Sequence, residues 1–353
     1  MSVELPLRLP RRAGRRTNLG LLSLLLTAGG TGVLAYAVGS PGWNAVVVGL
    51  HGAAGLGLLL LVPWKTVVVR RARRRPVGRR DPTAAVALGV LVGLTVLTGV
   101  LHSVGVAGPW AALGGITALH MHVGAAITVL PLLAIHAWGK RQRLRATDLS
   151  RRSLLRAGGL GAGAAALWFG SEAVLRLTGA PGGERRHTGS HEQGTGDPAA
   201  MPVTQWIGDT VPEEQARTLD VVVAGSRTRL PVADLDRGDT IRAVLDCTGG
   251  WYAEQEWSGV RLDRLLADLG TDLPADGSVD VVSVTGFRRR LPLHDAGRLL
   301  LAVSAAGEPL SPGHGAPVRL VAPGRRGFWW VKWVRRIEVV DSPWWLQSPF
   351  PLQ

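Results

Sequence analysis

The only cysteine of the 353-residue chain, Cys247, lies in the stretch VLDCTGGWYAEQEWSGVRLDRLL, between an aspartate and a Gly-Gly-Trp turn. A lone cysteine has no partner for a disulfide within its own chain. It serves either as a small buried apolar side chain or, as a thiolate, as a ligand for a thiophilic metal. If residues 241–247 form a strand, the side chain of Asp246 points to the opposite face, which favours a structural role for this carboxylate.

Histidines in apolar segments are the second group of side chains with possible chemistry. Four are His51, His102, His120 and His122; a fifth, His136, lies near the inner end of its segment and is expected to be an interfacial residue. If residues 44–64 and 114–138 are facing membrane helices, His51 and His122 lie at a similar depth, as the two axial ligands of a b-type haem must. We therefore predict one haem b with these two as the first-choice iron ligands and His102 and His120 as alternates. The other interpretation is that the histidines only hydrogen-bond headgroups or loop carbonyls, in a helical anchor without a cofactor.

Long apolar runs supply the helices that would position these histidines. Four runs contain no Lys, Arg, Asp or Glu and have roughly the 20 residues needed to cross a membrane. They are residues 19–38, 44–64, 84–106 and 114–138. A fifth run, 154–175, is shorter and weaker, with Arg156 near its start and Glu172 near its end. We predict five membrane-spanning helices.

The net charge of +14 is concentrated at alternate ends of these runs. Residues 1–18 carry five arginines, 65–80 carry eight basic residues and 139–156 carry seven, whereas the loops 39–43 and 107–113 carry none. This is the positive-inside pattern. It predicts a multi-pass protein of a bacterial plasma membrane, with a cytoplasmic N-terminus and the C-terminal half outside. Because the basic residues act as orientation signals, we expect no nucleic-acid partner.

The segment SRRSLLRAGGLGAGAAALWFG, residues 150–170, has the order of a twin-arginine export signal. The alternative is an arginine pair at the cytoplasmic end of an ordinary membrane helix. The signal predicts the twin-arginine translocase as a partner during export, with the fifth helix retained as a tether. The Gly-, Pro- and charge-rich residues 181–202 are expected to be a flexible linker.

Short β-rich segments follow residue 202, and several motifs occur among them in a fixed order. Cys247 is followed by Gly250-Trp251, Trp257-x-Gly259 and Leu265-Leu266; then come VVSVTGFRRRLPLHDA and, over residues 300–339, LLAVSAAGEPLSPGHGAPVRLVAPGRRGFWWVKWVRRIEV. This series resembles the sulfite-oxidase family of molybdopterin enzymes over roughly residues 203–340. The chain is most similar to the short bacterial form, without the C-terminal dimerisation domain.

The resemblance implies a site and a cofactor. Cys247 would be the catalytic molybdenum ligand, and the cofactor's dithiolene would supply further sulfurs. His314 and Arg319 match the pterin-contacting pair, and Trp330, Val331 and Lys332 match the phosphate-contacting loop. A soft thiolate suits molybdenum, and a phosphate needs cationic donors. Arg319 and Lys332 could instead be surface residues, and His314 part of a plain turn.

The chain also departs from the family. Residues 203–215 do not clearly match the segment that contacts the pterin before the cysteine, so no residue is assigned there. The substrate-pocket tyrosine of true sulfite oxidases has no counterpart, since Tyr252 is in the wrong position. An arginine cluster could hold an oxyanion or form a solvated face. It comprises Arg288, Arg289, Arg290, Arg325 and Arg326.

The fold class expected is an α-helical membrane bundle followed by an α+β sulfite-oxidase-type molybdopterin-binding domain. The expected membrane parts are a four-helix transmembrane domain over residues 1–145 and a twin-arginine-like segment with the fifth helix over 146–180. The linker is expected over 181–202, the catalytic domain over 203–342 and a tail over 343–353.

The function expected is oxygen-atom transfer on the extracytoplasmic side, either sulfite oxidation or sulfoxide reduction, with electrons exchanged through the membrane domain with haem or quinone. A small oxyanion or S-oxide, the quinone pool or another redox partner, and membrane lipid are the expected partners. A cofactor-free binding or sensory module, or a b-type cytochrome for electron transfer, is the alternative.

Overall fold

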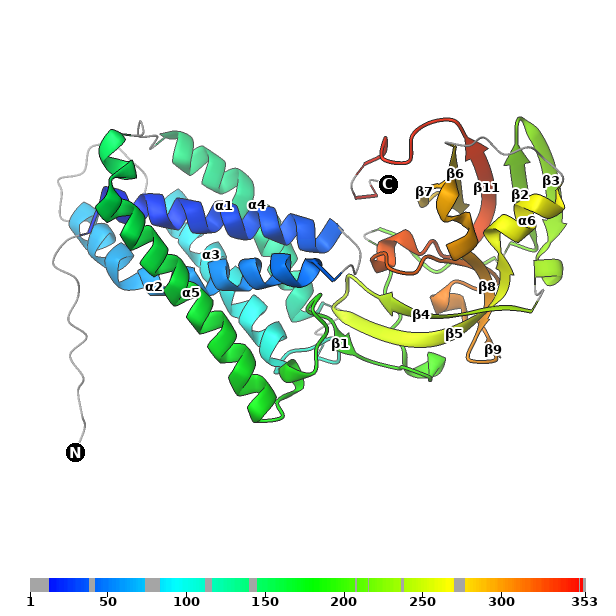
Figure 1. The fold of residues 1–353 in the computed structure, drawn as a ribbon, viewed down its shortest axis with the longest axis horizontal. Coiled ribbons are helices and arrows are strands. Elements are labelled where there is room, and N and C mark those ends of the chain that lie inside the picture. The colour runs from blue at the N-terminus through cyan, green and yellow to red at the C-terminus, as the bar shows by residue number, and fades with distance from the viewer. Residues whose placement is uncertain are drawn as a thin grey trace. The chain divides into compact units, whose positions relative to one another are not determined.

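The structure is a computed structural model. It describes residues 13–37, 42–73, 83–111, 116–139, 145–206, 208–214, 216–235, 238–269, 277–348 and 350–351. The chain divides into a helical unit, Met1–Ala35 with Gly42–Gly189, and a β-rich unit, Ser190–Gln353 with the short segment Tyr36–Pro41 (Figure 1).

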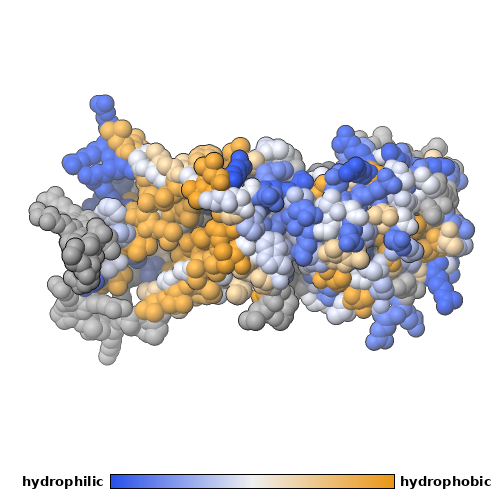
Figure 2. All heavy atoms as spheres, turned by 90° about the horizontal axis from the view of Figure 1, so that it is seen from below, coloured by the Kyte–Doolittle hydropathy of each residue, from blue (hydrophilic) through white to orange (hydrophobic). Residues whose placement is uncertain are grey.

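Four helices of the first unit are long and apolar enough to cross a membrane, as predicted. They are α1 (Arg15–Ala37), α2 (Asn44–Arg73), α3 (Thr83–Val104) and α4 (Ala118–Gly139). Within the unit, α3 packs against α4 and α2 against α5. Figure 2 shows largely hydrophobic side chains over the surface of this unit, and Val46, Val90 and Ile135 are at least 64% exposed. A surface of this kind on helices of this length is one that a bilayer could cover.

The fifth predicted span forms a helix, α5 (Arg151–Leu177), but it is not among the four that are apolar enough to cross a membrane. Its Gly/Ala-rich middle lowers its hydropathy, although Leu155, Phe169 and Leu177 are all exposed. The expectation of five apolar spans is therefore met for four of them.

The β-rich unit contains two sheets. In one, the order is β1 (His191–Glu192), β5 (Trp251–Arg261), β8 (Leu300–Ala305) and β10 (Arg319–Val321), with β4 (Asp239–Asp246) paired to β5 and β9 (Glu308–Pro309) to β8. In the other, the order is β3 (Ser226–Pro231), β2 (Thr218–Val223), β11 (Val334–Val340), β6 (Ser278–Ser283) and β7 (Arg288–Pro292). A short helix, α6 (Leu262–Asp268), follows β5.

A single buried core joins the two sheets. Strand β2 alternates in the two-residue period of a half-buried strand, with Leu219, Val221 and Val223 inside. They share the core with residues of the other sheet such as Trp257 and Leu301, both fully buried. Helices and mixed sheets in one unit are the α+β arrangement that we predicted.

Residues 190–202, the second half of the predicted linker, make regular contacts in the structure. Ser190 is fully buried, and β1 runs parallel to β5, with His191 opposite Trp251. The Asp197 carboxylate caps a 3₁₀ turn, Pro198–Ala200, by accepting hydrogen bonds from backbone N–H groups. The polar composition that suggested a linker instead serves these local bonds, and residues from Ser190 onward belong to the β-rich unit.

Candidate functional site

Cys247 lies in the tight turn that joins β4 to β5. Its N–H donates to the Trp251 carbonyl at 2.9 Å, and the Gly250 N–H donates to the Cys247 carbonyl at 3.1 Å. Gly250 has φ +91°, which glycine adopts without the cost that a Cβ would bring. The buried sulfur accepts a hydrogen bond from the Gly249 N–H at 3.3 Å. The turn therefore fixes the direction of the thiol.

The electrostatic environment of Cys247 has two opposing parts. Burial raises the pKa of the thiol, while the Gly249 N–H and the positive charges of Lys332 and Arg326 lower that pKa. A thiol in this setting keeps its proton until a positive group replaces it, which is the condition for binding a metal with release of the proton.

Arg319 is the most deeply buried cation of the site, at 1% exposed. Its guanidinium lies 5.0 Å from the ring centre of Trp257 and 5.6 Å from that of Trp330. One nitrogen donates to the His314 carbonyl at 3.0 Å, while Nε has no hydrogen-bond partner in the described part of the chain. Burial lowers the pKa of Arg319 to about 10, so the group stays charged at neutral pH.

Lys332 is half-buried and held by three amide oxygens. Its Nζ donates to the Thr204 carbonyl at 2.9 Å, the Gln205 side chain at 3.2 Å and the Gly313 carbonyl at 2.6 Å. Burial, and then the charge of Arg319, lower the pKa of Lys332 to about 7. Lys332 is therefore only partly protonated at neutral pH, and an anion such as a phosphate bound beside it and Arg319 would favour its charged form.

His314 ends a 3₁₀ turn, Pro312–His314, and is buried. Its Nδ1 lies 2.8 Å from the Ser311 hydroxyl. Burial, followed by the charges of Arg319 and Lys332, lowers the pKa of His314 to about 4. The imidazole is therefore neutral at neutral pH, and it can hydrogen-bond a ligand without adding charge.

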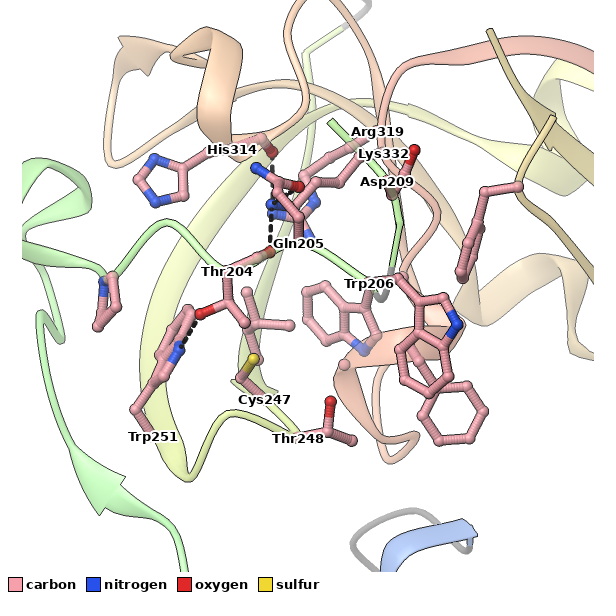
Figure 3. A pocket seen from close by; sticks show the side chains of 16 residues that line it. Thr204, Gln205, Trp206, Asp209, Cys247, Thr248, Trp251, His314, Arg319 and Lys332 are labelled. Atoms are coloured by element: carbon pink, nitrogen blue, oxygen red, sulfur yellow. Dashed lines mark hydrogen bonds between the residues drawn. The ribbon is translucent and has the colours of Figure 1, made fainter. Parts of the chain in front are cut away.

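These side chains line one pocket of about 610 Å³, its open mouth included, within the roughly 300–1,000 Å³ of small-molecule sites. In Figure 3 the Cys247 sulfur points toward Thr204, with His314, Arg319 and Lys332 beyond it. The other lining residues are Pro202, Gln205, Trp206, Asp209, Leu245, Thr248, Trp251, Phe287, Gly327, Phe328 and Trp330.

Four lining residues come from the segment to which the sequence assigned no role: Thr204, Gln205, Trp206 and Asp209. The Trp251 indole donates to the Thr204 hydroxyl at 3.0 Å, which ties this segment to the cysteine turn. No motif in the sequence marks it. Its hydrogen bonds join residues up to 145 positions apart, and only the assembled fold brings such positions together.

The three residues of the predicted phosphate-contacting loop, 330–332, contribute unequally to the pocket. Trp330 lines the pocket and donates to the Arg325 carbonyl at 3.2 Å. Val331 is fully buried, and its carbonyl accepts from the Leu320 N–H at 2.8 Å. The side chain of Val331 does not line the pocket, because strand-like pairing with β10 points it into the core.

The arginine cluster does not form one anion site or one solvated face. Arg290 pairs with Asp280, Arg325 with Asp295 and Arg326 with Asp246. Arg289 is buried with its guanidinium 4.0 Å from the Trp329 ring centre, and Arg288 is exposed. None of the five lines the pocket. The neighbours in sequence separate because alternate strand residues point to opposite faces.

In the helical unit, the rings of His51 and His122 lie side by side, with centres 5.7 Å apart and planes at 85°. The Nδ1 of His51 donates to the Ala28 carbonyl of α1 at 2.9 Å, and that of His122 to the Thr95 carbonyl of α3 at 2.7 Å. Since each Nδ1 carries the proton, each Nε2 is left as an acceptor that can bind a metal.

The alternate histidines lie in other contacts. His102 is buried, with Nε2 3.0 Å from the Gly189 carbonyl. The Nδ1 of His120 accepts from the Thr117 N–H at 3.2 Å. Neither joins the pair, and no group of three or more His, Cys, Asp or Glu able to hold a metal occurs in the described residues.

The comparisons with known proteins concern the β-rich unit. Residues 207–346 match the model of the oxidoreductase molybdopterin binding domain. Curated relatives include a nitrate reductase [NAD(P)H] of Hordeum vulgare, 37% identical over 98 residues, and a nitrate reductase [NADPH] of Phytophthora infestans, 39% identical over 95 residues. These matches cover 24% of this chain and 11% and 10% of those proteins, so the chain spans about a tenth of their length.

A solved structure, the sulfane dehydrogenase SoxCD from Paracoccus pantotrophus, is 29% identical with a TM-score of 0.34, and the match covers 36% of this chain and 39% of that one. The domain match favours an enzyme over a cofactor-free binding or sensory module. Residues 207–346 of this chain therefore form a molybdopterin-binding oxidoreductase domain.

Proposed function

We propose that this chain is a membrane-anchored enzyme that transfers an oxygen atom to or from a small oxyanion or S-oxide, with molybdenum held by molybdopterin. The observation that carries the proposal is one buried thiol, Cys247, in a pocket with two cationic side chains, Arg319 and Lys332, neither of which forms a salt bridge within the described part of the chain. The pocket's own carboxylate, Asp209, acts on Lys332 only through its charge.

The residues present fit the cofactor. Cys247 would be the protein ligand of the metal, since its sulfur is the only protein thiolate and its direction is fixed. Arg319 and Lys332 would hold the pterin phosphate, His314 would hydrogen-bond the pterin as a neutral imidazole, and Trp330 would form a wall. When bound, the group supplies two-electron redox chemistry and oxygen-atom transfer.

The protein's share of the reaction is orientation and charge. Oxidation of sulfite takes up the oxygen of one water and releases two electrons and two protons, and reduction of a sulfoxide reverses this balance. The aromatic residues Trp206, Phe287 and Phe328 line the pocket, and apolar walls of this kind would reduce the access of water to a bound substrate. Arg319 and Lys332 balance the charge of the phosphate that they would hold, and so fix the cofactor beside Cys247. Because curated relatives are named nitrate reductases, nitrate joins sulfite and sulfoxides as a substrate to test.

We further propose that electrons pass through a b-type haem held by His51 and His122 to the quinone pool. The support is the pairing of the two rings with both Nε2 atoms left for a metal. A haem bound there supplies a one-electron carrier. The charge distribution along the chain supports an extracytoplasmic catalytic unit, and the Ser-Arg-Arg-x-Leu-Leu order supports export by the twin-arginine translocase.

The test is the content of molybdenum and iron per chain, in protein purified in detergent from a host that makes molybdopterin. One molybdenum and one iron per chain, with a reduced-minus-oxidised b-type spectrum, is the expected result. Turnover with sulfite, methionine sulfoxide and nitrate then identifies the substrate. A folded protein without molybdenum would refute the enzyme, iron alone would make it a cytochrome, and molybdenum alone would refute the haem.

A further inference from the structure

Asp246, the residue before the thiol, holds a buried carboxylate that two distant segments bind. It is 0% exposed. One guanidinium nitrogen of Arg326 lies 2.5 Å from its Oδ1, with only 4% and 1% of the two side chains exposed. The Ser190 hydroxyl donates to the same oxygen at 2.7 Å. Burying two charged groups carries a high desolvation cost. Only a well-aligned contact between them, with further hydrogen bonds, offsets that cost.

The same contacts bring two walls of the pocket together. Asp246 and Arg326 form a parallel β-bridge, and a second nitrogen of Arg326 lies 3.4 Å from the Cys247 carbonyl. A Cβ added to Gly327 would lie 3.0 Å from the Cys247 Cα, so the two backbones are already in contact. The strand end that carries the thiol is thus fixed against the loop that carries Phe328 and Trp330.

The segment after Ser190 holds the turn from its other side. The His191 N–H donates to the Gly250 carbonyl at 2.9 Å, and His191 pairs with Trp251 across β1 and β5. Ser190 is also where the main segment of the β-rich unit, Ser190–Gln353, begins. Its hydroxyl therefore links the start of this unit to the carboxylate beside the thiol.

We propose that Ser190, Asp246 and Arg326 are positioning residues for Cys247, which set the direction of its sulfur toward molybdenum and the charge around the metal–sulfur bond. This inference rests on the proposed function, in which Cys247 is the metal ligand. Groups that orient a ligand in this way tune the metal without touching it.

The test uses the full chain in detergent, with the Mo(V) electron paramagnetic resonance signal, the thiolate-to-molybdenum absorption band and molybdenum per chain as readouts. Because a single substitution in the pair leaves one buried charge unpaired and is expected to unfold the unit, the double variant Asp246→Asn/Arg326→Gln carries the test. Ser190→Ala is the milder variant. Asp280→Asn/Arg290→Gln is the control, since that pair is also an Asp–Arg ion pair that is largely buried. It is bidentate, with N–O distances of 2.8 and 2.9 Å between β6 and β7.

The expected result is a shifted Mo(V) signal and absorption band in both test variants, or a fall of about 10- to 100-fold in metal affinity in a folded double variant, with the control unchanged. If the double variant does not fold, the spectrum of Ser190→Ala decides. Wild-type spectra and molybdenum content in every folded test variant would overturn the inference. A wild-type chain that binds no molybdenum would instead refute the proposed function on which it rests.

Discussion

At the scale of single residues, the site divides its work between one thiol and the groups around it. Cys247 offers the soft ligand, while Arg319 and Lys332 offer charge to an anion, and His314 stays neutral because burial lowers its pKa to about 4. Each of these properties comes from burial as much as from residue type.

Replacing the thiol tests its role directly. In Cys247→Ser the hard hydroxyl replaces a soft thiolate, so we expect molybdenum-dependent turnover to fall by more than the roughly 100-fold typical of losing an outer contact. Turnover and molybdenum per chain are the measurements, with thermal unfolding to show that the fold persists. Full turnover in this variant would contradict the assignment.

Lys332 makes the stability of the cofactor-free protein depend on pH. Its pKa is about 7 in the folded chain and 10.5 when unperturbed, so between these values the unfolded chain binds more protons. Stability therefore rises with pH across this window, by up to about 1.4 kcal/mol per pH unit for one proton, and is lost as the pH falls toward 7.

Lys332→Met should remove that dependence. Urea unfolding of cofactor-free protein, followed by tryptophan fluorescence at pH 7 to 10, measures it. Lys65→Met, which replaces a lysine of the helical unit, should keep the wild-type slope. Equal slopes in the wild type and in Lys332→Met would exclude Lys332 as their source.

At the scale of elements, the sheet around the site depends on close backbone contacts. The register of β5 against β8 shifts between Ser258 and Gly259, and a Cβ on Gly259 would lie 2.0 Å from the Leu301 carbonyl oxygen. Neither strand can move without breaking its pairing, so the position requires glycine.

Gly259→Ala should therefore destabilise the β-rich unit by about 1–3 kcal/mol, the usual cost of overpacking. Denaturant unfolding followed by tryptophan fluorescence checks this, with the adjacent Ser258→Ala as the control. A change of less than about 0.5 kcal/mol, the usual range for surface substitutions, would show that the two strands can separate enough to accept a Cβ.

The helices act on the histidines in a comparable way. Gly32 and Gly99 leave room for the rings, since a Cβ on either would lie about 3 Å from His51 or His122: 3.0 Å from the His51 Cε1 and 2.9 Å from the His122 Nδ1. Four helices thus contribute to the pair: α2 and α4 carry the two rings, while α1 and α3 each supply a carbonyl that accepts from a ring and a glycine that leaves room for it.

At the scale of the whole molecule, the two units are compact separately. Substitutions in different units with no shared partner should act independently. We expect His122→Ala to remove iron and the b-type spectrum while molybdenum per chain stays at the wild-type level. His120→Ala, two residues away and outside the pair, is the control. Wild-type iron content in His122→Ala would refute the proposed ligand.

The sequence by itself determined the features that depend on local pattern. Four runs of about 20 apolar residues can only be long helices in an apolar medium, and the described helices match them. The Cys247 turn follows from its glycines, and the similar depth of His51 and His122 follows from the helical rise. Only the family motif indicated that Arg319 lies in a binding site, because composition alone also allows an arginine on the surface.

Only the tertiary structure decided the partners that are distant in sequence. The Thr204 carbonyl accepts a hydrogen bond from Lys332, and the Ser190 hydroxyl donates one to Asp246. Arg326 forms an ion pair with Asp246 and does not join the other arginines of the cluster. Periodicity records which face of a strand is buried, but the order of strands in a sheet decides which buried groups meet. For this reason the contacts of residues 190–202 with the sheet were found only in the folded chain. The same holds for the place of Thr204, Gln205, Trp206 and Asp209 in the pocket.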